Sequence, residues 1–340
     1  MKDARSGDIE TFLERNGWGE AARAALAGDA SGRRYLRLRQ GRDSAVLMDA
    51  DPATGERVDA FLRVGRWLAA QGYSAPAILA VDEARGLLLL EDLGDALFAR
   101  LVAGEPARER DLYLGAIAFL IDLHSHRPPA FLAVGDGPAM ADLVALMPKW
   151  YLPGVDAAPS AEADRIAPLV GALYARFCDM PPVVSLRDFH AENLIWLPKR
   201  TGVAKVGLLD FQDAFATHPA YDLVSLLQDA RREASVATEA GCLTAYIAHR
   251  GLDQSRFSAA YALLGAQRAL RIIGIFARLC MHFGKPRYLA FAPRVWANLE
   301  RNLAHPALTD LAAAVHQGLP PLTPERLQRI ADKCGTCPTP

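Results

Sequence analysis

The sequence lacks an excess of charge of either sign, since 38 Lys and Arg residues balance 39 Asp and Glu residues and leave a formal net charge of −1 at pH 7. A protein with this balance has no general attraction to nucleic acid or anionic lipid, so any basic site must be local. The sequence also lacks an apolar run of the about 20 residues that a membrane-spanning helix needs. We therefore expect no nucleic-acid partner and no membrane partner.

Cysteine is scarce, with five residues scattered along the chain, as expected of reduced thiols in a cytosolic protein. Only Cys334 and Cys337 have the spacing of a metal or redox motif. Because no second Cys or His pair stands near them in the sequence, we expect a tail there and not a zinc site. The first eight residues carry acidic side chains and no apolar run, unlike a secretory signal, so we expect a cytoplasmic protein.

Hydrophobic residues make up 51% of the 340 residues, which is typical of a globular protein, and the length suggests two lobes or one large elaborated domain. No repeat and no long Ser/Gly or Pro linker divides the chain. Up to about residue 90 the pattern predicts a small sheet with two helices, and from about residue 95 it is mainly helical. The predicted strands are 35–38, 45–48, 77–81 and 87–90, and the predicted helices are 9–16, 56–71, 110–123, 166–177, 223–231 and 263–283.

These patterns predict a domain boundary near residue 93. We expect an N-terminal domain at 1–93, a C-terminal domain at 94–330 and a tail at 331–340. One strand-rich stretch interrupts the helical part: a buried strand at 183–186 leads into a polar loop, and apolar runs at 194–197 and 203–209 flank a turn.

Three polar residues stand at the ends of these strands. If the hairpin is centred on Thr201 and Gly202, Ile195 pairs with Leu208, and Asn193 falls opposite Asp210. Asp188 lies five residues before Asn193. Two oxygen donors side by side, with a further carboxylate nearby, suit a hydrated Mg²⁺ and a hydroxyl nucleophile that must lose a proton.

The pattern Asp188-x4-Asn193 followed by Asp210-Phe211-Gln212 resembles the catalytic loop and metal-binding tripeptide of the protein-kinase-like superfamily, in its aminoglycoside and choline phosphotransferase branch. The segments 218–223 and 123–125 match the same branch. The resemblance implies an α+β, protein-kinase-like bilobal fold, with a small β-rich N-lobe that binds nucleotide and a larger, mainly helical C-lobe.

The same resemblance implies ATP and Mg²⁺ as cofactors and assigns roles to single residues. Asp188 would orient and deprotonate the acceptor hydroxyl, and Asn193 and Asp210 would bind Mg²⁺. Asp222 would have a structural role in bracing the loop. For His190 we expect a bracing hydrogen bond and not catalysis.

The segment 28–35 stands where a kinase-like fold has its phosphate-covering loop, and its small residues, Ser31 among them, could let backbone N–H groups approach phosphate. An ordinary turn is the alternative for this segment. The segment 88–94 resembles the hinge of the family, where the backbone of Glu91 and Leu93 would bind the adenine edge.

Two departures from the family pattern affect phosphate binding and the loop. Met48 stands where a phosphate-holding lysine is expected, and Leu186 stands where a histidine is expected. A triphosphate still needs a cation, so we expect an arginine to replace the lysine, unless all the candidates form a solvated basic face. Glu56 could pair with this arginine or stabilise the first turn of a helix. The candidates are Arg33, Arg34 and Arg37.

A narrower resemblance covers most of the chain. The segments 28–35, 46–50, 209–214, 221–229 and 274–279 are similar to the bacterial anomeric kinases of cell-wall recycling, which phosphorylate N-acetylmuramate and N-acetylglucosamine at C1. Arginines on the predicted helix 263–283 would suit a carboxylate or a phosphoryl group, although a solvated helix face is the alternative. The residues predicted to bind the amino sugar are Asp213, Gln267, Arg268 and Arg271.

Two other functions stay open at this point. The same fold could phosphorylate another small acceptor, such as an aminoglycoside, choline or homoserine. Met48 and Leu186 also permit a nucleotide-binding pseudokinase, although the presence of Asp188, Asn193 and Asp210 argues against it. The sequence does not indicate an oligomeric state.

Overall fold

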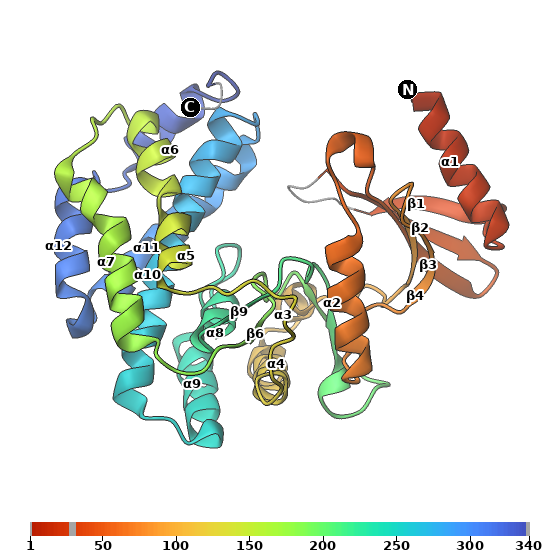
Figure 1. Cartoon of the computed structure of the whole chain (residues 1–340), viewed down its shortest axis with the longest axis horizontal. Coiled ribbons are helices and arrows are strands. Elements are labelled where there is room, and N and C mark those ends of the chain that lie inside the picture. Colours follow the sequence, from red (N-terminus) through yellow and green to blue (C-terminus); the bar gives the residue numbers. More distant parts are fainter. Residues whose placement is uncertain (1, 27–31, 338–340) are drawn as a thin grey trace. The chain divides into compact units, whose positions relative to one another are not determined.

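The computed structural model describes residues 2–26 and 32–337, which form two compact units (Figure 1). The first unit contains residues 1–106 and 192–213, and the second contains residues 107–191 and 214–340. This division differs from the expected boundary at residue 93. The hairpin at 192–213 joins the first unit because its backbone bonds to that unit: Leu208 N–H donates to the Ser74 carbonyl at 3.0 Å, and Trp196 N–H to the Ala96 carbonyl at 2.8 Å.

The first unit is built on a five-stranded antiparallel sheet in the order β1-β2-β3-β5-β4. Its strands are β1 (Ala22–Leu26), β2 (Arg34–Gln40), β3 (Asp43–Asp49), β4 (Ile78–Asp82) and β5 (Leu87–Glu91). Its helices are α1 (Lys2–Arg15), η1 (Pro52–Thr54), α2 (Asp59–Ala70) and α3 (Phe98–Gly104), and its hairpin has β7 (Leu194–Trp196), η3 (Gly202–Lys205) and β8 (Val206–Leu208). The sequence predicted β2 to β5 and missed β1.

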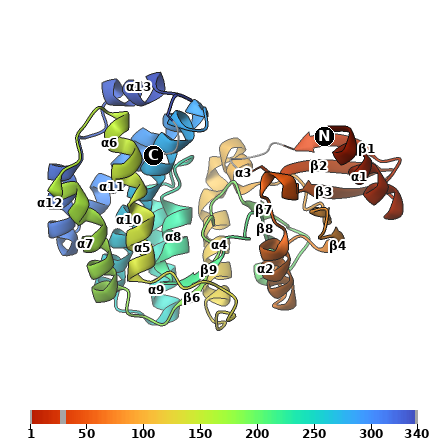
Figure 2. The same ribbon diagram turned by 45° about the horizontal axis from the view of Figure 1, so that its top comes forward.

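Alternation along the strands gives the sheet two different faces. One face carries Leu38, Leu47 and Leu89, which pack under Phe12 and Leu13 of α1 in a buried core (Figure 2). Because Tyr35 pairs with Met48 and Met48 with Leu88, those residues lie on the opposite face. At the β4–β5 turn, Gly86 has φ +62°, and a Cβ there would lie 2.0 Å from the Ala50 carbonyl oxygen, so only glycine fits.

The β7–β8 register differs by one residue from the predicted one. Ile195 pairs with Gly207 and Leu194 with Leu208, so the predicted pairing of Ile195 with Leu208 was wrong. The chain forms the 3₁₀ turn η3 at Gly202–Lys205 and closes with a bond from Leu197 N–H to the Lys205 carbonyl at 2.8 Å. The closing pair Trp196–Val206 encloses an odd number of turn residues, 197–205, whereas the predicted pairing requires an even number.

The second unit is mainly helical. Its α-helices are α4 (Glu109–Leu123), α5 (Gly137–Val144), α6 (Leu146–Gly154), α7 (Ala161–Phe177), α8 (Ala220–Leu227), α9 (Val236–Arg250), α10 (Gln254–Met281), α11 (Ala292–Leu303), α12 (Thr309–Gly318) and α13 (Pro324–Asp332). It also has the short 3₁₀ helices η4 (Pro286–Phe291) and η5 (Pro306–Leu308) and the strands β6 (Val183–Ser185) and β9 (Phe215–Thr217). A further 3₁₀ helix, η2 (Pro106–Arg108), contains the point of the chain where the first unit ends and the second begins. β6 pairs antiparallel with β9.

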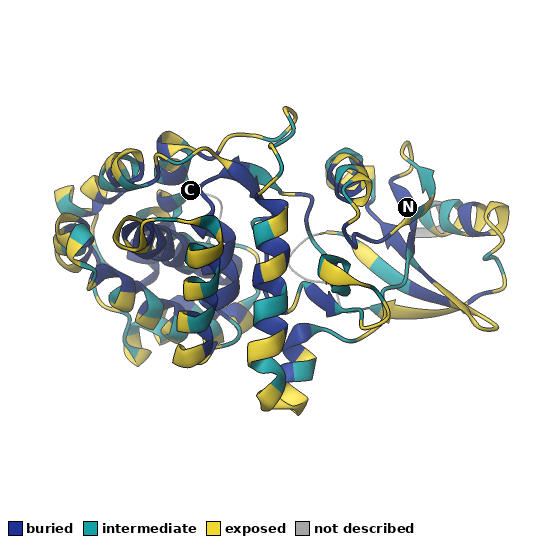
Figure 3. Ribbon diagram, turned by 90° about the horizontal axis from the view of Figure 1, so that it is seen from below, coloured by how far each residue is buried: buried dark blue, intermediate teal, exposed yellow. Residues whose placement is uncertain are grey.

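Helix α10 is the central helix of this unit, and most of its residues are buried. Figure 3 colours the described residues of the whole chain by burial, with buried residues in dark blue. It crosses α6 so closely that a Cβ on Gly274 would lie 2.6 Å from the carbonyl carbon of Leu146. α10 is long and apolar enough by composition to span a membrane, but 83% of that window is buried inside the structure. It is therefore the core helix of its unit.

One expected helix boundary in this unit was wrong. The helix expected at 223–231 is α8, which ends at Leu227, because the Asp229 side chain accepts from Arg231 N–H at 2.9 Å and turns the chain. The described part of the expected tail is bound to the unit. Gly335 N–H donates to the Cys280 carbonyl and Cys337 N–H to the Met281 carbonyl, both at 3.0 Å.

Candidate active site

The loop after β6 is fixed at its start by one buried carboxylate. Asp222, on α8, is fully buried and accepts hydrogen bonds from Ser185 Oγ at 2.7 Å, Leu186 N–H at 2.6 Å and Arg187 N–H at 3.0 Å. Burial raises the pKa of Asp222 to about 6, although these hydrogen bonds oppose the shift. The bonds match the structural role that we predicted for Asp222.

Arg187, directly before Asp188, has φ +69°, a left-handed conformation that is unusual for a residue other than glycine. Its carbonyl accepts from Ser225 Oγ at 3.1 Å and from Arg268 Nη1 at 3.0 Å, and Arg268 Nη2 also donates to Ser225 Oγ at 2.8 Å. Phe189 stacks on Phe119 with ring centroids 5.5 Å apart. The backbone on both sides of Asp188 is therefore held by buried contacts.

Arg268 thus contacts the loop backbone and not an open surface. It is 6% exposed and lies over the Tyr221 ring at 4.7 Å. Arg271, one helical turn further along α10, is only partly buried, and the structure gives it no ion pair with a described residue. The negative charge of Asp188 acts to raise the pKa of both Arg268 and Arg271.

His190 is buried in the second unit, and its Nε2 lies 3.3 Å from Arg231 Nη1. Burial lowers the pKa of His190, so the ring is neutral near pH 7. A neutral, buried ring in contact with a neighbouring segment fits the bracing role that we predicted for this residue.

Asn193 and Asp210 come together at one end of the β7–β8 hairpin, in the first unit. Leu209 N–H donates to the Asn193 carbonyl at 2.9 Å, so Asn193 lies opposite Leu209 and next to Asp210. The predicted pairing of Asn193 with Asp210 was therefore wrong by one residue, although the two remain neighbours. Asp210 has φ +54°, and its Oδ1 accepts from Gln212 Nε2 at 2.9 Å.

The residue after Asp210 anchors this strand end. Phe211 is fully buried and stacks on Phe61 of α2 with centroids 4.8 Å apart, and Gly65 leaves the space that its ring fills. The anchored backbone fixes the position from which the Asp210 carboxylate projects.

The oxygen donors at this end of the hairpin suit a hard cation such as Mg²⁺. Within residues 2–26 and 32–337, no group of three or more His, Cys, Asp and Glu side chains could hold a metal ion. Asn193 and Asp210 together could supply two protein ligands. This number fits Mg²⁺, which proteins commonly bind through one or two carboxylates together with substrate phosphates and water.

The three candidate arginines occupy different places in the first unit. Arg34 lies on the α1 side of the sheet, where it pairs with the buried Asp49. Arg37 is 9% exposed, and its Nη1 donates to both carboxylate oxygens of Asp95 at 2.8 and 2.7 Å, which fixes the 92–95 segment.

Arg33 is the candidate whose guanidinium is affected by the charge of Asp210. Its Nε donates to Glu56 Oε2 at 2.9 Å, and Glu56 Oε1 also accepts from Gly32 N–H at 2.9 Å. Burial acts to lower the pKa of Arg33, but the Glu56 hydrogen bond and nearby charges, that of Asp210 among them, outweigh it and raise the pKa. Glu56 precedes α2, so its alternative role in the first turn of a helix was wrong.

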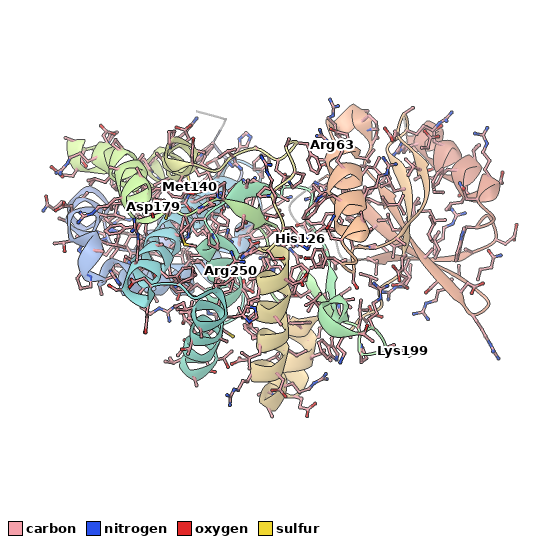
Figure 4. The ribbon with its side chains drawn as sticks, turned by 60° about the horizontal axis from the view of Figure 1, so that its bottom comes forward. Arg63, His126, Met140, Asp179, Lys199 and Arg250 are labelled. Carbon is pink, nitrogen blue, oxygen red and sulfur yellow. The ribbon has the colours of Figure 1, made fainter. Side chains whose placement is uncertain are left out.

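The remaining predicted residues have simple environments. In the described part of the chain, no hydrogen bond involves the backbone of Leu93, whereas Glu91 N–H donates to the Ala77 carbonyl at 2.8 Å. Asp213 is exposed on the first unit. Gln267 is fully buried, and its Nε2 donates to the carbonyl of Met140, labelled in Figure 4, at 3.2 Å. Ser31 lies outside the described residues.

Comparison with known proteins decides the family. A model described as "Phosphotransferase enzyme family" matches residues 23–258. The chain belongs to the phosphotransferase enzyme family. Curated proteins named N-acetylmuramate/N-acetylglucosamine kinase are similar to it. The protein from Caulobacter vibrioides is 42% identical over 92% of this chain and 96% of its own, and that from Pseudomonas aeruginosa is 34% identical over 93% and 98%.

Solved structures confirm the predicted protein-kinase-like fold. A choline/ethanolamine kinase family protein from Mesorhizobium loti has a TM-score of 0.61 at 17% identity and covers 92% of this chain and 100% of its own. An ADP-bound aminoglycoside phosphotransferase has a TM-score of 0.58 at 15% identity, over 91% and 97%. As a member of this family, the chain is a phosphotransferase that uses a nucleotide and a small-molecule acceptor.

The phosphotransferase sequence left two contacts of the loop unpredicted. Ser185 bonds to Asp222, and Ser225 bonds to the Arg187 carbonyl. Ser225 stands three residues after Asp222, so both lie on one face of α8, and this spacing was a usable signal. The residue types gave no further indication, because serines are common at unremarkable helix positions.

Proposed function

We propose that this phosphotransferase is an ATP- and Mg²⁺-dependent kinase that phosphorylates the anomeric hydroxyl of N-acetylmuramate or N-acetylglucosamine. The observation that carries the proposal is the 42% identity, over 92% of the chain, to a kinase named for these two sugars. Identity at this level along the whole chain supports a shared acceptor class more strongly than fold does, because one fold serves many acceptors.

In the proposed reaction the oxygen of the acceptor hydroxyl bonds to the γ-phosphorus of ATP, and ADP leaves. Asp188 accepts the proton that this hydroxyl loses. The braced backbone at Arg187 supports this role, because a carboxylate that must meet one hydroxyl benefits from a fixed position. Asn193 and Asp210 would hold Mg²⁺, which neutralises phosphate charge when bound.

The nucleotide would use three features of the first unit. The unbonded backbone of Leu93 leaves a donor and an acceptor for an adenine edge. Arg33 would replace the missing lysine, since Met48 is fully buried and carries no charge. Asp213, which is exposed, and Arg271 stay predicted contacts of the sugar, whereas the contacts of Gln267 and Arg268 favour structural roles.

The test is phosphorus NMR of the purified protein with ATP, MgCl₂ and a panel of acceptors. The panel contains both amino sugars, an aminoglycoside, choline and homoserine. We expect a sugar 1-phosphate signal with either amino sugar and only slow ATP hydrolysis with the others. A phosphorylated aminoglycoside, choline or homoserine would refute the proposed acceptor, and no product with any acceptor would favour a nucleotide-binding pseudokinase.

A further inference from the structure

Two arginines on α10 stand one helical turn apart and face the same buried region of the second unit, but they have different partners. Arg268 donates to the Arg187 carbonyl and to Ser225 Oγ. Arg271 has no hydrogen-bond or ion-pair partner in the described chain, and its Nε is buried without a hydrogen bond. The rest of the Arg271 side chain keeps partial exposure, so a ligand can reach it.

The surroundings of Arg271 carry more positive than negative charge. Burial lowers the pKa of Arg271, the nearby guanidinium groups of Arg187 and Arg268 lower it further, and Tyr221 and Asp188 oppose them. An arginine keeps its proton at neutral pH even so. Asp222 is engaged by the loop backbone, which leaves Asp188 as the nearby carboxylate that acts on Arg271.

A buried guanidinium without a hydrogen-bond partner is costly, and a structural arginine normally has one. Arg268 shows what a structural arginine looks like in this helix. Arg271 differs in that its donors are unused and its charge is not matched by a dedicated acid. A bound anion would supply both the acceptors and the missing charge.

We propose that Arg271 forms an anion subsite beside Asp188 that binds the carboxylate of the acceptor, and that it sets the preference for N-acetylmuramate over N-acetylglucosamine. This inference rests on the proposed function. The two sugars differ in the lactyl ether on C3, which gives N-acetylmuramate a carboxylate. Phosphate oxygens have the same hydrogen-bonding chemistry, so the experiment separates a carboxylate on the sugar from a phosphoryl group of the nucleotide.

The experiment compares Arg271→Met and Arg271→Lys with a matched control, Arg278→Met. Arg278 lies two turns further along the same helix, and its Nε is also buried without a partner, but its guanidinium lies near the Phe283 ring at 5.9 Å. For each protein, kcat/KM is measured with N-acetylmuramate and with N-acetylglucosamine, the KM for ATP is measured separately, and the thermal midpoint reports folding.

We expect Arg271→Met to lower kcat/KM for N-acetylmuramate by about 10- to 100-fold, the usual effect of losing a charge-assisted hydrogen bond. N-acetylglucosamine should change by less than about threefold, because it makes no such bond. Arg271→Lys should restore part of the loss, since it keeps the charge without the planar fork. Arg278→Met should keep the wild-type ratio of the two sugars.

Equal losses for both sugars would overturn the proposal, and a raised KM for ATP would then assign the anion to the nucleotide. An unchanged ratio in Arg271→Met would overturn it as well. If the wild-type protein phosphorylates neither sugar, the proposed function fails. Titration calorimetry with N-acetylmuramate still decides the subsite in that case: heat that is lost in Arg271→Met supports it, and no heat with the wild-type protein overturns it.

Discussion

Replacing Arg33 by Ala tests how this enzyme holds a triphosphate without the lysine of its family. Met48 is fully buried between Tyr35 and Leu88 and cannot neutralise phosphate. Arg37 already forms an ion pair with Asp95. Arg33 is therefore the candidate for a phosphate contact, because the charge of Asp210 acts on its guanidinium.

The expected magnitude follows from the type of contact. A charge-assisted hydrogen bond to phosphate contributes about 1.5–3 kcal/mol, which corresponds to a loss of about 10- to 150-fold in kcat/KM for ATP. The Glu56 carboxylate already accepts a hydrogen bond at the Nε edge of the guanidinium, and 19% of the Glu56 side chain is exposed. Glu56→Gln should therefore weaken ATP use less than Arg33→Ala, because it releases the arginine without removing it.

The assay is steady-state kinetics with ATP varied at saturating sugar, together with calorimetric binding of ADP. Arg34→Ala is the matched control, since Arg34 is 65% exposed and pairs with Asp49 on the other face of the sheet. It should change kcat/KM for ATP by less than about twofold. Wild-type kinetics in Arg33→Ala would refute the reasoning, and the cation would then have to come from the second unit or from a further metal ion.

Three further outcomes are expected. Asp188→Asn should lower kcat by about 10²–10⁴ with little change in nucleotide affinity, measured by kinetics and calorimetry, and near-wild-type turnover would remove Asp188 from its role. Asp210→Ala should raise the Mg²⁺ concentration for half-maximal activity by about tenfold or more, and an unaltered Mg²⁺ titration would contradict this. Acid should destabilise the protein, because burial lowers the pKa of His124 to about 3 and that of His218 to about 4. Below about pH 6.5 the two histidines bind protons in the unfolded chain but not in the folded chain. The free energy of unfolding should therefore fall by up to about 1.4 kcal/mol per histidine per pH unit below pH 6.5. Urea melts at pH 7, 6 and 5 measure this, and equal stability at the three values would disprove it.

The sequence predicted the polar loop after β6 and the strands around it, because that information is local. Asp188 and Asn193 lie on one short loop, and apolar runs on both sides define the strands that hold it. The family pattern of residues then indicated phosphotransfer, and the family match confirms it. The brace by Asp222 could also be predicted, because the resemblance placed that residue and burial fixed its contacts.

What the sequence left open depended on three-dimensional register. The hairpin turn contains a 3₁₀ segment, and one residue more or less in a turn changes every pairing after it, as it did for Ile195. The sequence also could not show which of the three arginines contacts phosphate, because that depends on which face of the sheet each one occupies. Alternation showed that Arg34 and Arg37 lie on opposite faces of a strand, but it could not show which face α1 covers.

The arginines of α10 show why composition alone misleads about binding residues. Gln267, Arg268 and Arg271 looked equivalent as polar positions in an apolar helix, yet Gln267 bonds to a backbone carbonyl and Arg268 braces the loop. Only the partners of each side chain separate them. A polar residue that donates to the backbone of a neighbouring element stabilises the fold, whereas the Nε of Arg271 has no partner in the described chain. Because Arg278 also has a buried Nε without a partner, the unused donor marks Arg271 as a candidate binding residue only together with its position near Asp188.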